Sequence, residues 1–137
     1  MIAHLRRRAQ LAASARVVAH LRATHQRVYP RPEQGLFNQR CHDNVAEWCR
    51  VHPGHGCTEV VQVEPDGDPA LHYVARDPEG ALLEVSVGYR AGECEYYRVR
   101  DLADPAEAAR GFAARLEYWR AAYVSPWGKL LRVERVV

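Results

Sequence analysis

The sequence predicts a single α+β domain in which an antiparallel sheet of about five strands packs against helices. The chain of 137 residues, 47% of them hydrophobic, is long enough for one core and too short for two. Apolar residues recur at helical spacing near both ends, whereas the middle of the chain alternates apolar and polar residues in short runs between turn sequences. Together these patterns predict helices that pack against a sheet.

The first part of the chain is expected to be mainly helical. Residues 2–27 carry a loose apolar stripe with arginines on the other faces. The stretch "YPRPEQG", residues 29–35, predicts a loop because it holds two prolines and a glycine. Asn38 is then the predicted N-cap of a helix over residues 39–51, which "HPGHG" ends.

Four short strands are expected next, as an antiparallel meander. They cover residues 58–64, 70–76, 81–88 and 95–100, separated by "PDGDP", "DPEG" and "RAGE". Asp104 and Pro105 predict a helix that runs to about Tyr123. After the predicted turn "SPWG", residues 129–137 predict a last strand at a sheet edge. Residues 1–137 thus form one domain, with a basic helix at 1–27, a central part at 35–100 and a closing part at 104–137.

Charge is distributed unevenly along the chain. The net charge is +2, but residues 1–40 carry +7 and the rest −5. So small a total does not predict nucleic-acid binding, whereas the arginine-rich first helix predicts a contact surface for a protein partner. Only one of the 19 basic residues, Lys129, is a lysine, which fits a bacterial or phage gene of high GC content.

The expected setting is the cytoplasm. The first residues lack the continuous apolar segment of a signal peptide, so the four cysteines are expected to be reduced rather than paired in disulfides. No run approaches the ~20 apolar residues that a membrane span needs, and no membrane partner is expected.

Cys41 is the candidate nucleophile. If Asn38 caps the helix, Cys41 occupies its third position, where free backbone N–H groups and the helix dipole favour a thiolate. A histidine nearby in space would complete the activation. His42 points about 100° away from Cys41 on the helix, so we expect the base to be His72 in the strand "ALHYVAR".

Glu84, in the following strand "ALLEVSV", is the candidate partner of His72. Two strand registers keep the two residues on one face. In the first, Glu84 lies directly opposite His72; in the second, Ser86 does and Glu84 is the diagonal neighbour. In either register the carboxylate can orient the imidazole. Asn38 or Gln39 could donate to an oxyanion beside the Cys41 backbone N–H. A further candidate, Asn44, lies one turn after Cys41 and is expected to point into the same cleft.

The order of these residues, together with "LHYVARDPEGALLEVS", resembles the papain-like superfamily in its compact bacterial forms, the NlpC-like peptidases and the transglutaminase-like proteins. The resemblance covers about residues 35–90. It implies a papain-like core, with Cys41 as nucleophile, His72 as base and Glu84 as orienting acid. The implied activity is that of a hydrolase or acyl transferase acting on an amide or ester bond of a protein, peptide or small amide, without a cofactor.

The chain also departs from that pattern. No aromatic residue follows the cysteine directly, no glutamine stands at the spacing that papain uses for its oxyanion donor, and a glutamate replaces the commoner aspartate. These departures leave a purely structural interpretation open beside the catalytic one. In the structural interpretation, Cys41 is a small buried hydrophobic residue.

Zinc is the rival interpretation of the same region. The stretch "CHDNVAEWCRVHPGHGC" is dense in ligand types, and zinc could take Cys49, His52, His55 and Cys57. The spacing matches neither a CxxC nor an HxxxH motif. The alternative function is then a noncatalytic binding or adaptor domain, with or without a structural zinc, that uses the arginine-rich helix as its contact surface.

Overall fold

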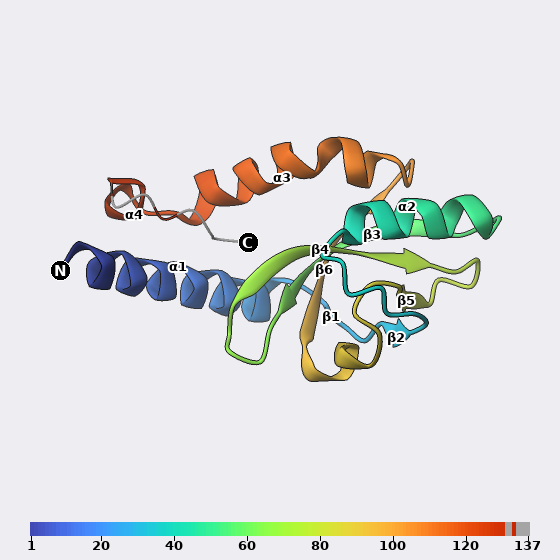
Figure 1. Ribbon diagram of the computed structural model, residues 1–137, viewed down its shortest axis with the longest axis horizontal. Coiled ribbons are helices and arrows are strands. Elements are labelled where there is room, and N and C mark those ends of the chain that lie inside the picture. The colour runs from blue at the N-terminus through green and yellow to red at the C-terminus, as the bar shows by residue number, and fades with distance from the viewer. Residues whose placement is uncertain (131–132, 134–137) are drawn as a thin grey trace.

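The computed structural model describes residues 1–130 and 133, and its mixed α+β architecture confirms the predicted class (Figure 1). The helices are α1 (Ile2–Thr24), α2 (Cys41–Val51), α3 (Glu107–Tyr123) and α4 (Pro126–Leu130), with a 3₁₀ helix, η1 (Gly88–Glu93). The strands are β1 (Arg27–Val28), β2 (Arg31–Pro32), β3 (Gly56–Val63), β4 (Pro69–Arg76), β5 (Leu82–Glu84) and β6 (Glu95–Leu102). All six strands belong to one sheet.

The strand order, β1-β6-β3-β4-β5-β2, corrects the predicted meander of about five antiparallel strands. Strand β2 runs parallel to β5, and β6 pairs with β3 rather than with β5. The segment from β2 onward takes the free edge of β5: the Glu33 N–H donates to the Glu84 carbonyl at 2.9 Å, and the Leu36 N–H to the Ser86 carbonyl at 2.9 Å. With the edge of β5 filled by this segment, β6 lies toward the other edge of the sheet, between β3 and β1.

Several assignments also differ from the prediction: β5 covers only Leu82–Glu84 of the strand predicted at residues 81–88, and three helix or loop boundaries change. Helix α1 ends at Thr24, and β1 and β2 occupy residues predicted as helix and loop. Helix α3 begins at Glu107, although the Asp104 carboxylate does accept a hydrogen bond from the Ala106 N–H at 3.0 Å. Helix α4 replaces the predicted turn and the first residues of the predicted last strand, since Pro126 suits a first helical position. The rest of that strand, apart from Val133, lies outside the described residues.

Both faces of the sheet are buried. The helices α1, α2 and α3 cover one face, and their cluster includes Val61, Leu71 and Tyr73 from the sheet. A smaller cluster lies on the other face, where Val60, Val74 and Tyr96 pack with residues of η1 and its end, Ala91 and Cys94. The face of β4 that carries His72 therefore lies against protein rather than solvent.

Candidate active site

Cys41 lies at the start of α2, but one detail of the prediction is wrong. The N-cap residue is Arg40, so Cys41 is the first helical residue rather than the third. Asn38 instead closes the turn before the helix, because its Oδ1 accepts a hydrogen bond from the Arg40 N–H at 3.1 Å. Cys41 still lies within the first turn, where backbone N–H groups lack helical partners and the helix dipole favours an anion.

His72 and Glu84 are joined directly. The Cα pairs Ala75–Leu83 and Arg76–Leu82 select the second predicted register, which leaves Glu84 diagonal to His72. The His72 Nε2 and Glu84 Oε2 atoms are 2.7 Å apart. The Glu84 carboxylate is fully buried and also accepts hydrogen bonds from the Tyr96 hydroxyl at 3.1 Å and from the Ser86 and Val87 N–H groups at 2.8 and 3.2 Å. Since Nε2 faces Glu84, the other ring nitrogen of His72, Nδ1, is available to the thiol.

Cys41 and His72 meet at an edge of β4. Cys41 packs with the helix-side cluster, whereas His72 projects from the other face of the sheet beside Val74. Strand β5 pairs only with Ala75 and Arg76, so the ladder between β4 and β5 stops before residues 72 and 73. The thiol there interacts with the His72 side chain and with the Tyr73 backbone N–H.

The electrostatics of this trio favour a thiolate beside an imidazolium. Burial opposes ionisation of Cys41, but the charge of His72 and hydrogen bonds from His42, His72 and the Tyr73 backbone outweigh it and lower the pKa of the thiol to about 6. Burial likewise opposes the charge on His72, yet Glu84 and Cys41 raise its pKa well above the ordinary value. The pKa of Glu84 is lowered because His72 and the backbone N–H donors outweigh its burial.

His42 is a second imidazole beside the thiol, which the sequence analysis had set aside. Its pKa is raised, and the largest cause is a hydrogen bond with Cys41. The His42 ring is stacked on the Phe112 ring of α3 with a centroid distance of 4.5 Å. The adjacent positions of Cys41 and His42 in the sequence were the available signal for this contact.

The three predicted supporting residues have different roles. Asn44 is buried, and its Nδ2 donates to Ser86 Oγ and to Asn38 Oδ1, both at 2.9 Å. Asn38 Nδ2 donates back to Asn44 Oδ1 at 3.2 Å. These amides brace the loop against the strand end; Asn44 uses both of its N–H donors in this brace, whereas Asn38 uses one of its two. Gln39 is exposed and its side chain has no hydrogen-bond partner among the described residues, which leaves it as a candidate donor.

Cys49, His52 and Cys57 of the zinc alternative have contacts of their own, whereas the His55 ring lies 5.3 Å from that of His52 and its Nδ1 is buried without a hydrogen-bond partner among the described residues. Cys49 Sγ donates to the Gly56 carbonyl at 3.2 Å, and His52 Nδ1 donates to the Trp48 carbonyl at 2.8 Å. Cys57 is fully buried in the helix-side cluster. Within residues 1–130 and 133, no three His, Cys, Asp or Glu side chains are grouped so that they could hold a metal ion.

No family model, curated protein or solved structure matches the chain. Among the described residues, the protein has no helix with the length and apolar character that a membrane span needs. The interpretation of the site therefore rests on the chemistry of Cys41, His72 and Glu84.

Proposed function

We propose that the protein is a cysteine-dependent hydrolase or acyl transferase of papain-like type, acting on an amide or ester bond. One observation carries the proposal. Cys41, His72 and Glu84, from α2, β4 and β5, lie together in the interior: His72 Nε2 is 2.7 Å from Glu84 Oε2, and the charge of His72 lowers the pKa of the Cys41 thiol to about 6. Such a series supplies a nucleophile that is ionised at neutral pH, a proton donor and acceptor, and a group that orients the imidazole.

The first half of the reaction forms an acyl-enzyme. Cys41 Sγ attacks the substrate carbonyl carbon, and the carbonyl electron pair moves onto the oxygen. The backbone N–H of Cys41, with the Gln39 amide as a second donor, stabilises that oxyanion. When the intermediate collapses, the bond to the leaving nitrogen or oxygen breaks and the His72 imidazolium gives its proton to the leaving atom.

The second half releases the acyl group. Water or an amine attacks the thioester carbon and loses its proton to His72, after which Cys41 leaves as the thiolate. Glu84 stays ionised throughout and holds the imidazole through Nε2. Hydrolysis, deamidation and transfer share this scheme and differ in the leaving group and the second nucleophile.

The burial of the site restricts the form of the substrate. Cys41 is 7% exposed and His72 is 5% exposed. A slender group, such as an extended peptide or a protruding amide side chain, can approach such a thiol, whereas a flat folded surface cannot. A peptide, an extended protein segment or a small amide is therefore the proposed substrate.

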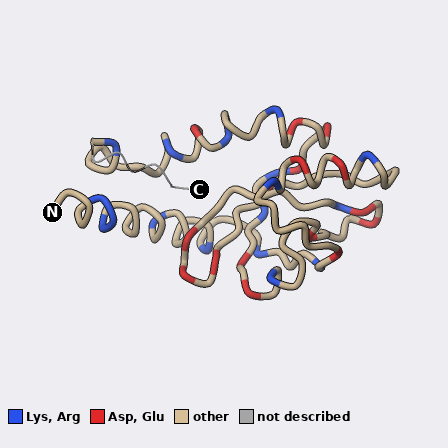
Figure 2. Tube along the Cα trace, in the orientation of Figure 1, with Lys and Arg blue, Asp and Glu red and all other residues tan. Residues whose placement is uncertain are grey.

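A partner-binding role for α1 is a second candidate that does not compete with catalysis. Ile2 and Leu5 are exposed at the start of α1, and arginines lie along the same helix (Figure 2). A protein partner with an acidic, partly apolar surface would match this end of α1. An Arg7→Glu, Arg8→Glu variant should then lose a co-purifying partner while its Cys41 reactivity is unchanged.

Acylation by an activated ester tests the enzyme proposal. The protein is incubated with p-nitrophenyl acetate, and peptide mass spectrometry locates the acetyl group. We expect acetyl-Cys41 in the wild type and in a Cys49→Ser control, and a strong decrease in His72→Gln. Acetylation spread evenly over the four cysteines, or unaffected by His72→Gln, contradicts the proposal.

A further inference from the structure

The loop before Cys41 holds an aromatic side chain at the surface in a strained backbone. Phe37 has a φ of 50° and Gln39 a φ of 57°, and these are the only non-glycine residues with positive φ in the described part of the chain. Phe37 is nevertheless 53% exposed. A conformation that costs energy and leaves an aromatic ring in water is often retained for a functional reason.

Two glycines leave the space that the Phe37 ring and its backbone occupy. A Cβ atom on Gly35 would lie 2.6 Å from Phe37 Cε2, and one on Gly88 would lie 3.1 Å from the Gly35 Cα atom. No larger residue fits at either position without displacing its neighbours. Tyr89, which follows Gly88, is 76% exposed, and its ring centroid lies 5.9 Å from that of Phe37. Two open aromatic rings thus lie together beside glycine backbone.

The aromatic pair is fixed to the segment that supplies the orienting carboxylate. The Leu36 and Phe37 N–H groups both donate to the Ser86 carbonyl, at 2.9 and 3.0 Å. Ser86 is two residues beyond Glu84, and its N–H donates to the Glu84 carboxylate at 2.8 Å. Because Cys41 is four positions after Phe37 in the chain, their Cα atoms lie at most about 14 Å apart.

The charges near this pair are already neutralised within the protein. Arg31 pairs with Glu33 at 2.8 Å, and Arg90 with Glu64 at 3.1 Å. Arg40 pairs with Asp43 at the start of α2. Among the described residues, the exposed rings and the half-exposed Leu36 therefore offer an apolar surface whose neighbouring arginines are paired. A ligand group that matches this surface is an uncharged apolar side chain.

We propose that Phe37, Tyr89 and Leu36 form a binding platform for an apolar side chain of an extended peptide substrate whose reacting carbonyl lies at Cys41. This inference rests on the proposed function. An extended peptide advances about 3.3 Å per residue, so the recognised side chain lies within about four residues of the reacting one. Aromatic faces bind apolar and aromatic groups over a large area, which gives the platform its selectivity.

Peptide electrophiles test the platform. The probes are nine-residue Gly/Ser peptides with a chloroacetyl group on the central side chain and one Leu or Phe moved through the four positions on each side. We expect at least one position to label Cys41 roughly tenfold faster than the peptide without Leu or Phe, the lower limit for an apolar group in a hydrophobic site. The gain should disappear in Tyr89→Ala.

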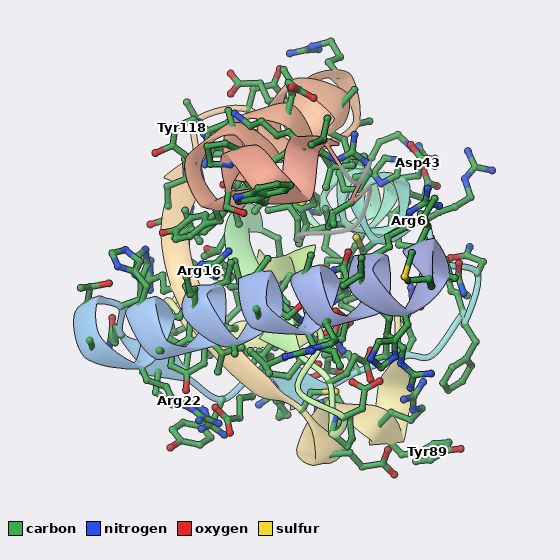
Figure 3. The ribbon with its side chains drawn as sticks, turned by 90° about the vertical axis from the view of Figure 1, so that its left-hand side faces the viewer. Arg6, Arg16, Arg22, Asp43, Tyr89 and Tyr118 are labelled. Carbon is green, nitrogen blue, oxygen red and sulfur yellow. The ribbon has the colours of Figure 1, made fainter. Side chains whose placement is uncertain are left out.

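Tyr118→Ala is the matched control. Tyr118 is also an exposed tyrosine, but it lies on α3, far from Tyr89 in Figure 3. The preference should persist in this variant. Since Tyr89 is largely exposed and its ring contact is with Phe37, its removal should not prevent folding, which thermal unfolding of both variants checks.

Labelling by iodoacetamide, measured in parallel, separates the two proposals. If iodoacetamide does not react selectively with Cys41, the nucleophile and the proposed function are wrong. If it does, but no peptide position gains or the gain survives in Tyr89→Ala, the platform is wrong and the nucleophile stands.

Discussion

Two fully buried carboxylates in the sheet are paired in opposite ways. Glu59 on β3 meets guanidinium groups: Arg115 of α3 approaches its two oxygens at 2.7 to 3.2 Å, and Arg100 lies at 3.4 Å. Glu84 on β5 instead meets the imidazole of His72 at 2.7 Å. Both carboxylates are 0% exposed, so their burial does not distinguish them.

The partner decides what each carboxylate can do. A guanidinium group keeps its proton at any ordinary pH, so the pairs at Glu59 can hold α3 on the sheet but cannot transfer a proton. An imidazole exchanges its proton near neutral pH, and His72 passes the influence of Glu84 on to Cys41. We therefore infer a structural role for Glu59 and propose a chemical role for Glu84.

The largest expected effect follows from removing the imidazole. With a pKa of about 6, half of Cys41 is thiolate at pH 6. A return to the ordinary thiol pKa near 9 would reduce that fraction about 500-fold. We expect His72→Gln to slow alkylation of Cys41 at pH 6 by two to three orders of magnitude, measured by mass spectrometry. Glu59→Gln is the comparison variant, and an equal decrease in it would remove the distinction.

Removing the charge of Glu59 should act on stability. Glu59→Gln leaves Arg115 without its buried carboxylate, and the loss of one partner of a buried pair costs about 3 kcal/mol, the low end of the usual range because Arg115 is partly exposed. The free energy of unfolding from urea denaturation measures this. In folded protein the alkylation profile of Cys41 should be unchanged. A loss below about 1 kcal/mol would mean that the pair does not hold α3.

Glu84→Gln should moderately change both the free energy of unfolding and the alkylation of Cys41. The variant loses charge-assisted hydrogen bonds in a buried site, and we expect it to unfold about 2 kcal/mol more easily. It also withdraws the charge that raises the pKa of His72, so the alkylation profile of Cys41 should move about one unit toward higher pH. An unchanged profile would show that Glu84 has no influence on the thiol.

Acidification should reduce the difference in the free energy of unfolding between the wild type and Glu84→Gln. Because the folded-state pKa of Glu84 lies below its usual value of about 4.5, its ionisation stabilises the fold fully above that value. This contribution is lost as the pH falls through the folded-state pKa. Urea denaturation between pH 7 and 3 should show the two free energies of unfolding converging below about pH 4.5. A constant difference contradicts the assignment.

The smallest expected effect concerns the brace beside Glu84. Asn44→Ala removes the hydrogen bonds to Ser86 and Asn38, and we expect a loss of about 1 kcal/mol in the free energy of unfolding. Gln39→Ala, at an exposed side chain without partners among the described residues, should change stability little. Equal losses in the two variants would mean that Asn44 is not a brace.

The elements predicted from the sequence are those with a clear period. Strands β3 and β4 and the end of α3 agree with the prediction because their apolar patterns span whole elements. Strands β1 and β2 have two residues each, too few to show any period. The position of β6 depends on β2 filling the edge of β5, a long-range choice that no local pattern reveals.

The site was predicted only in part, because local periodicity fixes which residues share a strand face but not the long-range pairing of the strands. The alternation of β4 and the turn after Asp77 limited His72 and Glu84 to two registers, and the structure selects one of them. The N-cap was misplaced because Asn38 turns toward Asn44 instead of the helix start. Tyr96 also donates to Glu84 but was missed, because β3 and β4 separate its strand from β5 and its hydroxyl reaches the carboxylate across the face of the sheet, which no local pattern indicates.

The central claim is that Cys41 differs from the other three cysteines because of its imidazole neighbours. The most direct measurement is the iodoacetamide alkylation rate of each cysteine against pH in the wild type. We expect a midpoint near pH 6 for Cys41, and midpoints above that of an ordinary thiol for Cys49, Cys57 and Cys94, whose pKa values burial raises. A midpoint for Cys41 near pH 9, together with the others, would contradict it.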